Sequence, residues 1–318
     1  MVLLRALIPA LLVLTVAGAR AETAIVLNSA DETISLVDTV TYKELSRLPV
    51  GKEPHHLMAT PDDQQLIVAN AAGNELVFVD PITGQIINRL KNISDPYQVG
   101  YSPDKKWFVS NSLRLDRIDI YLGADFKLVK RLPAPKTPSH LAFDRASQFV
   151  FVTLQESNEI MAIDLAKQEA AWKMPVGKQP AGIWMTPDDR YLLVAITGED
   201  NVQVIDWRAR QVVKKLKTGN GAHNFVAWGD GRHVFLSNRM ANTISIIDQN
   251  ALTVTDTFAA PGGPDCMEVT RDRKQLWYTA RFARKVNVID LETKKLARSI
   301  DVGRSPHGVY FHTHASRQ

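Results

Sequence analysis

Five of the eight histidines in this 318-residue chain recur at a fixed spacing, together with one aspartate. They occupy the two positions that follow a repeated proline or alanine: His55, His56, His140, His223, Asp265 and His307. Two arginines, Arg239 and Arg281, are also separated by 42 residues. Neutral imidazoles bind transition metals, and guanidinium groups pair with carboxylates and phosphates. If the repeats bring these side chains together, the chemistry to expect is the binding of an anion or a metal ion.

Three interpretations of these positions are open at the level of sequence. The first is a site for a small anion, such as a carboxylate, a phosphate or a haem propionate. Its candidate residues are His55, His56, His140, His223, Asp265, His307, Arg239 and Arg281. The second is a site for zinc, copper or haem iron, with the candidate ligands His55, His223, Asp265, Cys266 and His307. The third is structural, with histidines that donate hydrogen bonds to loops of neighbouring repeats.

The repeat that spaces these residues is 42 residues long. An apolar run that ends in aspartate recurs at this period or a multiple of it, at Asp38, Asp80, Asp164, Asp206, Asp248 and Asp290. A second column precedes the histidine positions, with Pro54, Pro96, Pro138, Pro180, Ala222, Pro264 and Pro306. Because the second column has seven members, the sequence predicts seven repeats. The aspartates read as structural, since Asp ends a strand by accepting hydrogen bonds from turn amides.

Each repeat holds four short runs of β-forming residues separated by turn residues. In the first complete repeat they cover residues 56–59, 66–70, 76–80 and 86–90. Four antiparallel strands in about 42 residues are typical of a propeller blade. The chain begins, after residue 21, with a second-strand run and ends with a first-strand run at residues 308–311. We therefore predict an all-β, seven-bladed propeller whose closing blade is shared between the N- and C-terminal ends.

Several short motifs resemble the repeat signature of the YVTN-type β-propeller family. They include Leu66–Asn70, Val109–Asn111 and Phe235–Asn238, together with the aspartate strand ends and Ser102-Pro103-Asp104. The resemblance covers the chain from residue 22 onward and implies the propeller fold. More distantly the chain is similar to d1-type haem propellers, which implies a haem-ligating histidine at a channel mouth, although no one histidine here aligns uniquely with it. No Cys-x-x-Cys-His motif occurs, so covalently attached c-type haem is excluded.

Chain direction predicts which of these side chains share a face. The inner strand of each blade starts at one end of the central channel, and the loop between the second and third strands returns to that end. The histidine positions and the two arginines should therefore lie on one face. His223, Asp265, His307 and His55 belong to four consecutive blades and should form an arc.

The N-terminal residues favour export. A positively charged start at Met1–Arg5 precedes an apolar run over residues 6–16 and the small-x-small motif Ala19-Arg20-Ala21. We expect residues 1–21 to be a cleaved signal peptide, without a membrane anchor because the apolar run is short. Residues 22–318 should then form a single propeller domain in the periplasm or outside the cell. His312 and His314 we expect on a solvated end.

Composition and missing motifs narrow the function. The formal net charge of +4 and the absence of dense basic runs argue against nucleic-acid binding. There is no Gly-x-Ser-x-Gly and no His-Glu-x-x-His motif. We expect a monomeric, exported binding, scaffold or maturation protein rather than an enzyme, with a small ligand or a periplasmic protein as partner. The alternatives are a metal- or haem-binding, redox-associated propeller and a lactonase-like hydrolase. Cys266, the single cysteine, can form no intrachain disulfide, and we expect it to be buried.

Overall fold

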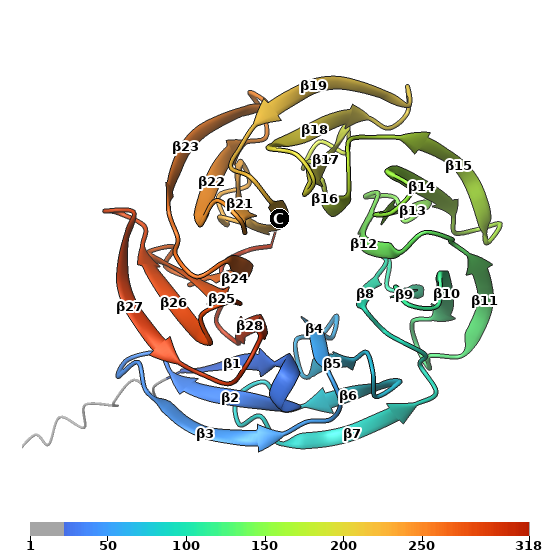
Figure 1. Ribbon diagram of the computed structural model, residues 1–318. Coiled ribbons are helices and arrows are strands. Elements are labelled where there is room, and N and C mark those ends of the chain that lie inside the picture. The colour runs from blue at the N-terminus through green and yellow to red at the C-terminus, as the bar shows by residue number, and fades with distance from the viewer. Residues whose placement is uncertain (1–21, 318) are drawn as a thin grey trace, which may run out of the picture.

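A computed structural model describes residues 22–317, which form seven four-stranded antiparallel sheets arranged in a ring (Figure 1). The signal peptide predicted for residues 1–21 lies outside the described residues, as does residue 318. The all-β, seven-bladed propeller predicted from the repeat is confirmed. Among the described residues, no helix combines the length and the apolar character needed to span a membrane.

Each of the first three blades is a meander of consecutive strands. Blade 1 consists of β4 (Pro54–Ala59), β5 (Leu66–Asn70), β6 (Glu75–Val79) and β7 (Ile86–Lys91). Blade 2 consists of β8 (Gln98–Tyr101), β9 (Trp107–Ser112), β10 (Arg117–Leu122) and β11 (Leu128–Pro133). Blade 3 consists of β12 (Pro138–Phe143), β13 (Phe149–Leu154), β14 (Glu159–Asp164) and β15 (Glu169–Pro175).

The next three blades repeat the same order. Blade 4 consists of β16 (Pro180–Met185), β17 (Tyr191–Ile196), β18 (Asn201–Asp206) and β19 (Gln211–Lys217). Blade 5 consists of β20 (Ala222–Ala227), β21 (His233–Asn238), β22 (Thr243–Asp248) and β23 (Thr253–Ala259). Blade 6 consists of β24 (Pro264–Val269), β25 (Gln275–Ala280), β26 (Lys285–Asp290) and β27 (Lys295–Asp301).

Blade 7 joins the two ends of the chain. Its strands are β28 (Pro306–Phe311), β1 (Thr23–Asn28), β2 (Thr33–Asp38) and β3 (Glu44–Pro49), and the 3-10 turn η1 (Ser29–Asp31) links β1 to β2. Strand β28 is the inner strand and pairs antiparallel with β1, with Ala24 opposite Phe311 and Ile25 opposite Tyr310. The side chains of Tyr310 and Phe311 are fully buried. The predicted closing blade is therefore confirmed, and it leaves no free sheet edge at the junction of the two ends.

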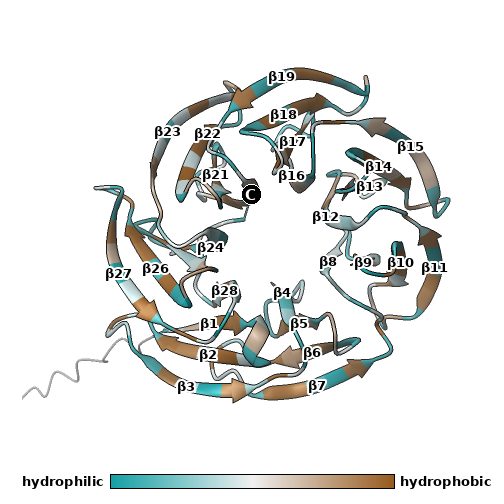
Figure 2. Cartoon of the chain, viewed as in Figure 1, coloured by the Kyte–Doolittle hydropathy of each residue, from teal (hydrophilic) through white to brown (hydrophobic). Residues whose placement is uncertain are grey.

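The hydrophobic core lies between the blades. Second and third strands such as β5 and β6 are buried along their whole length, because a neighbouring blade covers each of their faces. One cluster joins Ile25 and Ile34 of blade 7 to Leu66 and Val77 of blade 1. The fourth strands form the rim of the ring and carry alternating polar residues, as Figure 2 shows. This packing holds the inner strands in fixed positions around the ring centre.

The aspartate column ends the third strands, as predicted. Oδ1 of Asp80 accepts hydrogen bonds from the amides of Ile82 (3.0 Å) and Thr83 (2.7 Å), and from the Thr83 hydroxyl (2.9 Å). Asp164 and Asp248 accept bonds from the two following turn amides in the same way. These carboxylates close turns and take no part in a site.

The C-terminal tail is not the solvated end that the sequence suggested. His314 forms an isolated β-bridge with Thr270, and the Ala315 amide donates to the Val269 carbonyl at 2.8 Å. Arg317 forms an ion pair with Glu268 at 2.6 Å. The tail thus leaves blade 7 and is fixed against blade 6.

Candidate functional site

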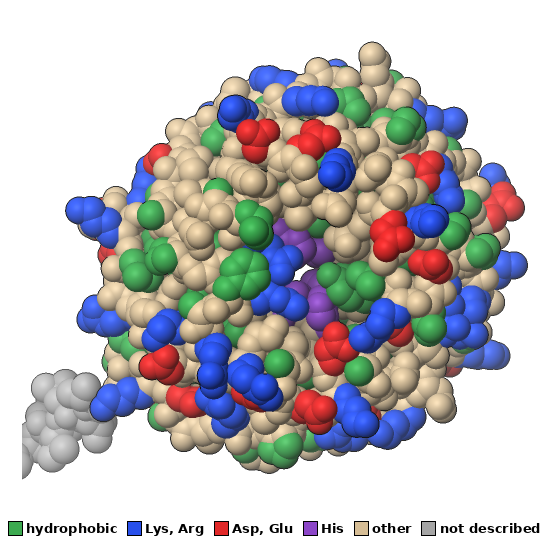
Figure 3. Space-filling view, viewed as in Figure 1, with side chains coloured by type: hydrophobic (Ala, Val, Ile, Leu, Met, Phe, Trp, Pro, Cys, Tyr) green, Lys and Arg blue, Asp and Glu red, His purple; other side chains and the backbone are tan. Residues whose placement is uncertain are grey.

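The repeated histidine positions lie inside the inner strands rather than in the loops before them. His55 and His56 belong to β4, His140 to β12, His223 to β20 and His307 to β28. Seen from one face of the ring, the centre is hollowed, with histidine side chains at its base and Lys or Arg side chains beside them (Figure 3). We call the set His55, His56, His140, His223, Asp265, Cys266 and His307, with Arg239 and Arg281, the channel cluster.

A β-bulge accompanies the cluster in blade after blade. In β12, Pro138 pairs with Leu154 but Leu141 pairs with Val152, so three steps on the inner strand match two on its partner. The same shift occurs in β16, β20, β24 and β28, and a similar one occurs in β4. A bulge re-aims side chains. The bulge therefore shifts the register of the inner strand, in each of these blades, at the positions that the cluster residues occupy.

Burial in the cluster is nearly complete. The exposed fractions are 4% for His55, 1% for His140 and His307, and 0% for Asp265, whereas the side chains of Arg239 and Arg281 are 21% and 22% exposed. From sequence, these positions are expected at the mouth of the channel. The structure instead buries the imidazoles within the ring and leaves the two guanidinium groups at its opening.

Asp265 is the ionic centre of the cluster. Its Oδ2 lies 3.2 Å from Arg281 Nη1, 3.4 Å from Arg239 Nη2 and 3.7 Å from His307 Nε2, while Oδ1 lies 3.2 Å from His223 Nε2. Burial alone raises the pKa of Asp265, but His307, His223 and Arg239 outweigh it and hold the pKa well below its usual range. Asp265 is therefore ionised.

The imidazoles are neutral at neutral pH. Burial, followed by the nearby histidines and Arg281, lowers the pKa of His55 and of His307 well below the usual value. Burial also lowers the pKa of His56 to about 4, and the pKa of His140 falls for the same reason. For His223, burial and then the Arg239 charge lower the pKa. A neutral imidazole has one N–H donor and one lone pair, so each ring can donate and accept.

The imidazole rings close into a continuous set around the channel. The His55 ring centre lies 3.9 Å from His307 and 4.1 Å from Tyr97. The His140 ring centre lies 5.5 Å from His56 and 5.2 Å from His223. The sequence predicted an arc over four consecutive blades, and His140 of blade 3 extends that arc across the channel.

A hydrogen bond assigns the proton in one of the rings. His56 Nδ1 lies 2.6 Å from the Tyr97 carbonyl oxygen, which can only accept, so Nδ1 carries the proton. His223 Nε2 lies between a donor, Arg239 Nη1 at 3.1 Å, and an acceptor, Asp265 Oδ1 at 3.2 Å, so its tautomer is not assigned by these contacts. Among the described residues, five buried atoms of the cluster have no hydrogen-bond partner: His56 Nε2, His140 Nε2, His223 Nδ1, Arg239 Nε and Asp265 Oδ1.

Two groups of three side chains could hold a metal ion. In each group, one ligand atom from every residue lies within 4.8 Å of the other two, and the groups are His55, His56 and His307, and Asp265, Cys266 and His307. The sequence-based metal set included His223, which belongs to neither group, and omitted His56, which does. Column spacing selected His56 as a candidate for anion binding but not for the metal set.

Cys266 is buried, as expected, and unoxidised. Burial raises the pKa of its thiol well above the usual value, so the thiol is protonated. The Asn224 amide donates to Sγ at 3.3 Å, and His307 Nδ1 lies 3.7 Å away. A thiol binds a metal ion as the thiolate, so Cys266 could act as a ligand only if a bound metal ion displaced its proton.

Apart from His56, which bonds the Tyr97 carbonyl, hydroxyl and amide side chains on or near second strands bond the inner strand of the next blade. The Thr153 hydroxyl donates to the Ala181 carbonyl at 2.8 Å, the Thr197 hydroxyl to Ala222 at 2.6 Å and the Thr279 hydroxyl to His307 at 2.9 Å. Ser29 and Asn111 make the same kind of bond to Pro54 and Ser139. The ring is thus fastened by other residues, which weakens the structural interpretation of the histidines.

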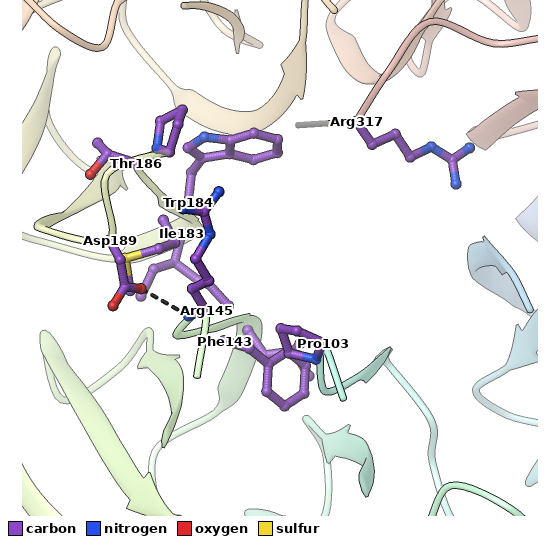
Figure 4. Close-up of a pocket in the computed structure, with 12 residues that line it drawn as sticks. Pro103, Phe143, Arg145, Ile183, Trp184, Thr186, Asp189 and Arg317 are labelled. Carbon is purple, nitrogen blue, oxygen red and sulfur yellow. Dashed lines mark hydrogen bonds between the residues drawn. The ribbon is translucent and has the colours of Figure 1, made fainter. Parts of the chain in front are cut away.

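Two further cavities involve residues that the sequence did not single out. One of about 390 Å³ is lined by Phe143, Ile183, Trp184, Arg145 and Arg317, and Figure 4 shows Trp184 and Arg317 on opposite sides of it. A second, of about 300 Å³, reaches from Trp184 and Arg317 to His56 and Cys266 of the cluster. The anchored tail that carries Arg317 therefore lines the cavity on the far side of the histidines, which no repeat spacing could reveal.

Solved structures share this fold at low sequence identity. A functionally unknown protein from Desulfotomaculum acetoxidans matches with a TM-score of 0.79 and 16% identity, over 93% of this chain and 100% of that chain. The dihydro-heme d1 dehydrogenase NirN gives 0.68 and 14%, over 91% and 75%. Kuenenia stuttgartiensis hydrazine synthase gives 0.67 and 17%, over 80% and 88%.

These likenesses show a common fold and no more. No curated protein matches the sequence. The match to a family is more specific, because it extends over residues 1–317 and agrees with the repeat signature and the seven closed blades. On this ground the chain belongs to the YNCE-like beta-propeller family.

Proposed function

We propose that this protein is an exported, non-enzymatic binding protein that takes a small anionic ligand at the histidine- and arginine-lined end of its channel. The observation that carries the proposal is the excess of buried donors beneath two partly exposed guanidinium groups. Periplasmic location is part of the proposal and rests on the leader-like residues 1–21.

The donor excess follows from the hydrogen bonds already present. Arginine has only donors, so Arg239 Nε–H is a buried donor without an acceptor. His223 Nδ1 is also buried without a hydrogen-bond partner. A buried donor left without an acceptor costs about 1–3 kcal/mol of folding free energy. An oxygen of a carboxylate or phosphate would accept from Arg239 Nε–H and remove that cost.

The charge balance points the same way. Two guanidinium charges face one carboxylate, that of Asp265, and the surrounding imidazoles are neutral, so the cluster keeps an excess positive charge. The guanidinium groups are exposed enough to meet a ligand that enters from solvent. Exposed Phe282 lies beside this opening, with its ring centre 5.9 Å from the Arg239 guanidinium carbon. An apolar rim favours an anion that also has an apolar part.

Thermal melting in the presence of single anions tests the proposal. Phosphate, succinate, citrate and haemin would each be added at millimolar or lower concentration to chelator-treated protein. We expect at least one of them to raise Tm, because a ligand that binds only the folded state stabilises it. Arg239→Gln and Arg281→Gln should lose the shift relative to their own Tm, and Arg284→Gln, which changes an exposed arginine, should keep it.

Two outcomes would reject the proposal. One is the absence of any Tm shift across the four probes. The other is a shift that survives both Arg239→Gln and Arg281→Gln, which would locate the binding elsewhere.

A further inference from the structure

We infer that His55, His56 and His307 form a binding site for a divalent transition-metal ion of the zinc class, with Asp265 as the nearby carboxylate. The inference goes beyond anion binding, because the ion would bind whether or not an anion follows it. It rests on where the three rings meet and on which of their nitrogens are left without a partner.

The three rings come from two adjacent inner strands, β4 and β28. Their centres are 3.9 Å apart for His55 and His307, 4.7 Å for His56 and His307, and 4.8 Å for His55 and His56. One nitrogen from each lies within 4.8 Å of the other two. Tetrahedral zinc, with Zn–N near 2.0–2.1 Å, needs nitrogens about 3.4 Å apart. Small side-chain rotations therefore suffice to bring the three nitrogens around one ion.

The proton positions leave lone pairs free. Because His56 donates from Nδ1 to the Tyr97 carbonyl, its Nε2 has the lone pair, and Nε2 is buried without a partner among the described residues. A histidine whose other nitrogen donates to a backbone carbonyl is the usual arrangement of a metal ligand. His55 Nδ1 lies 2.9 Å from the protonated His56 Nδ1, so His55 Nδ1 must be the unprotonated nitrogen of its ring.

The surroundings also suit a cation. Asp265 is completely buried, its Oδ2 lies 3.7 Å from His307 Nε2, and its Oδ1 lies 3.2 Å from His223 Nε2. A buried carboxylate is costly unless cations or donors surround it. Three histidine ligands leave at least one coordination position of zinc open. That position could accept a water or an anion.

The structural alternative does not explain these atoms. His56 does bond the next blade, through Nδ1 and the Tyr97 carbonyl at 2.6 Å, but its Nε2 stays without a partner. Thr279 and Ser29 bond the carbonyls of His307 and Pro54. Buried nitrogens without partners destabilise the fold, and a bound cation would offset that cost.

Equilibrium binding of Zn²⁺ alone to the chelator-treated, tag-free chain, in a buffer without coordinating anions, tests the inference. We expect one Zn²⁺ per wild-type chain. His56→Gln and His307→Gln should each weaken binding at least about tenfold, the loss seen even when a residue that only orients a ligand is removed. His233→Gln, a histidine of strand β21 paired with Asp230, is the matched control and should bind as wild type does.

The result can be separated from folding and from anion binding. Circular dichroism melting of each variant shows whether it is folded, and the wild-type stoichiometry needs no variant. Absence of stoichiometric Zn²⁺ binding by the wild-type chain overturns the inference, as does unchanged binding by folded His56→Gln and His307→Gln. A Tm shift with phosphate or citrate in chelator-treated protein would still support anion binding in that case. Zn²⁺ binding without any Tm shift from the anions would support the metal site and reject the proposed anion binding.

Discussion

Asp80 and Asp265 are the same residue in opposite surroundings. Asp80 ends a third strand, stands at the rim of its blade and accepts three hydrogen bonds within a turn of its own making. Asp265 is completely buried at the ring centre and meets His223, Arg239, Arg281 and His307 from three blades, while its Oδ1 has no hydrogen-bond partner. The hydrogen-bond partners of Asp80 come from its own turn, whereas the ionic partners of Asp265 come from distant parts of the sequence.

This difference separates framework from site. Turn aspartates recur around the ring because each blade needs its turn, and their polar atoms are satisfied within a few residues. The channel cluster occurs once, at the ring centre, where several buried polar atoms have no hydrogen-bond partner. Natural folds tolerate such costs mainly where a ligand or a reaction requires them. The predictions below test each side of the comparison.

The framework fails most severely if the ring is opened. Truncation from Gly308 onward removes most of β28, the buried Tyr310 and Phe311, and the partner of β1. We expect no soluble, cooperatively melting protein, because blade 7 would expose a free edge. Removal of residues 316–318 alone keeps β28 and should leave a folded ring. A cooperative melt of the longer truncation would contradict the closure.

The next largest effect should come from Asp265→Ala. The change leaves Arg239 and Arg281 without their shared carboxylate, and breaking a buried ion pair from one side costs about 3 kcal/mol. Urea unfolding should report this loss, and Asp265→Asn should recover little of it because the charge is still missing. A stability equal to that of wild type would show that the cluster is not held together by this carboxylate.

Asp80→Ala should cost less, about 1 kcal/mol, through the lost turn hydrogen bonds. Here Asp80→Asn should restore most of the stability, because an amide oxygen can accept the same turn bonds. The contrast between the two asparagine variants is the sharpest form of the comparison. If Asp80→Asn lowers the free energy of unfolding as much as Asp80→Ala does, then the charge of Asp80, rather than its turn hydrogen bonds, stabilises the fold.

Acid should weaken the framework gradually. Turn hydrogen bonds lower the pKa of Asp38, Asp164 and Asp290, and the Arg232 side chain first, with turn amides, lowers the pKa of Asp248 to about 2. A lowered folded-state pKa stabilises above the unfolded value near 4, and this stability is lost as pH falls through the folded value. The free energy of unfolding should therefore decline below about pH 4. Asp248→Asn should show a slightly shallower decline, since exposed ion pairs contribute little.

The fold could be predicted from sequence because its information is periodic. The 42-residue spacing of Asp38 and Asp80 counts blades, and the unmatched strands at the two chain ends reveal the closure. Column spacing also selected the cluster residues. Spacing could not predict the burial of His55, because a bulge within an inner strand leaves the repeat length unchanged. Nor could it predict that His140 would lie near His223, which depends on the width of the channel.

The metal set proposed from sequence contains Asp265, Cys266 and His307, which form one spatial group, but it differs from the other group for a related reason. Alignment favoured His223 because it shares a column with His55, whereas proximity in the ring favours His56. Sequence spacing does not show where the residue at the second position of a bulged strand lies, and only the structure shows that His56 is close to His55 and His307. The anchored tail also escaped prediction, since Arg317 lies beyond the last repeat and pairs with Glu268 of blade 6.

A high-resolution crystal structure grown with Zn²⁺ and phosphate would test the central claim, that the channel cluster binds ligands, most directly. We predict anomalous density for one ion among His55, His56 and His307, and phosphate oxygens within hydrogen-bond distance of Arg239 Nε and His223 Nδ1. A cluster that holds only water, with imidazoles turned to backbone carbonyls and no unsatisfied nitrogen, would contradict the claim and leave the histidines as part of the framework.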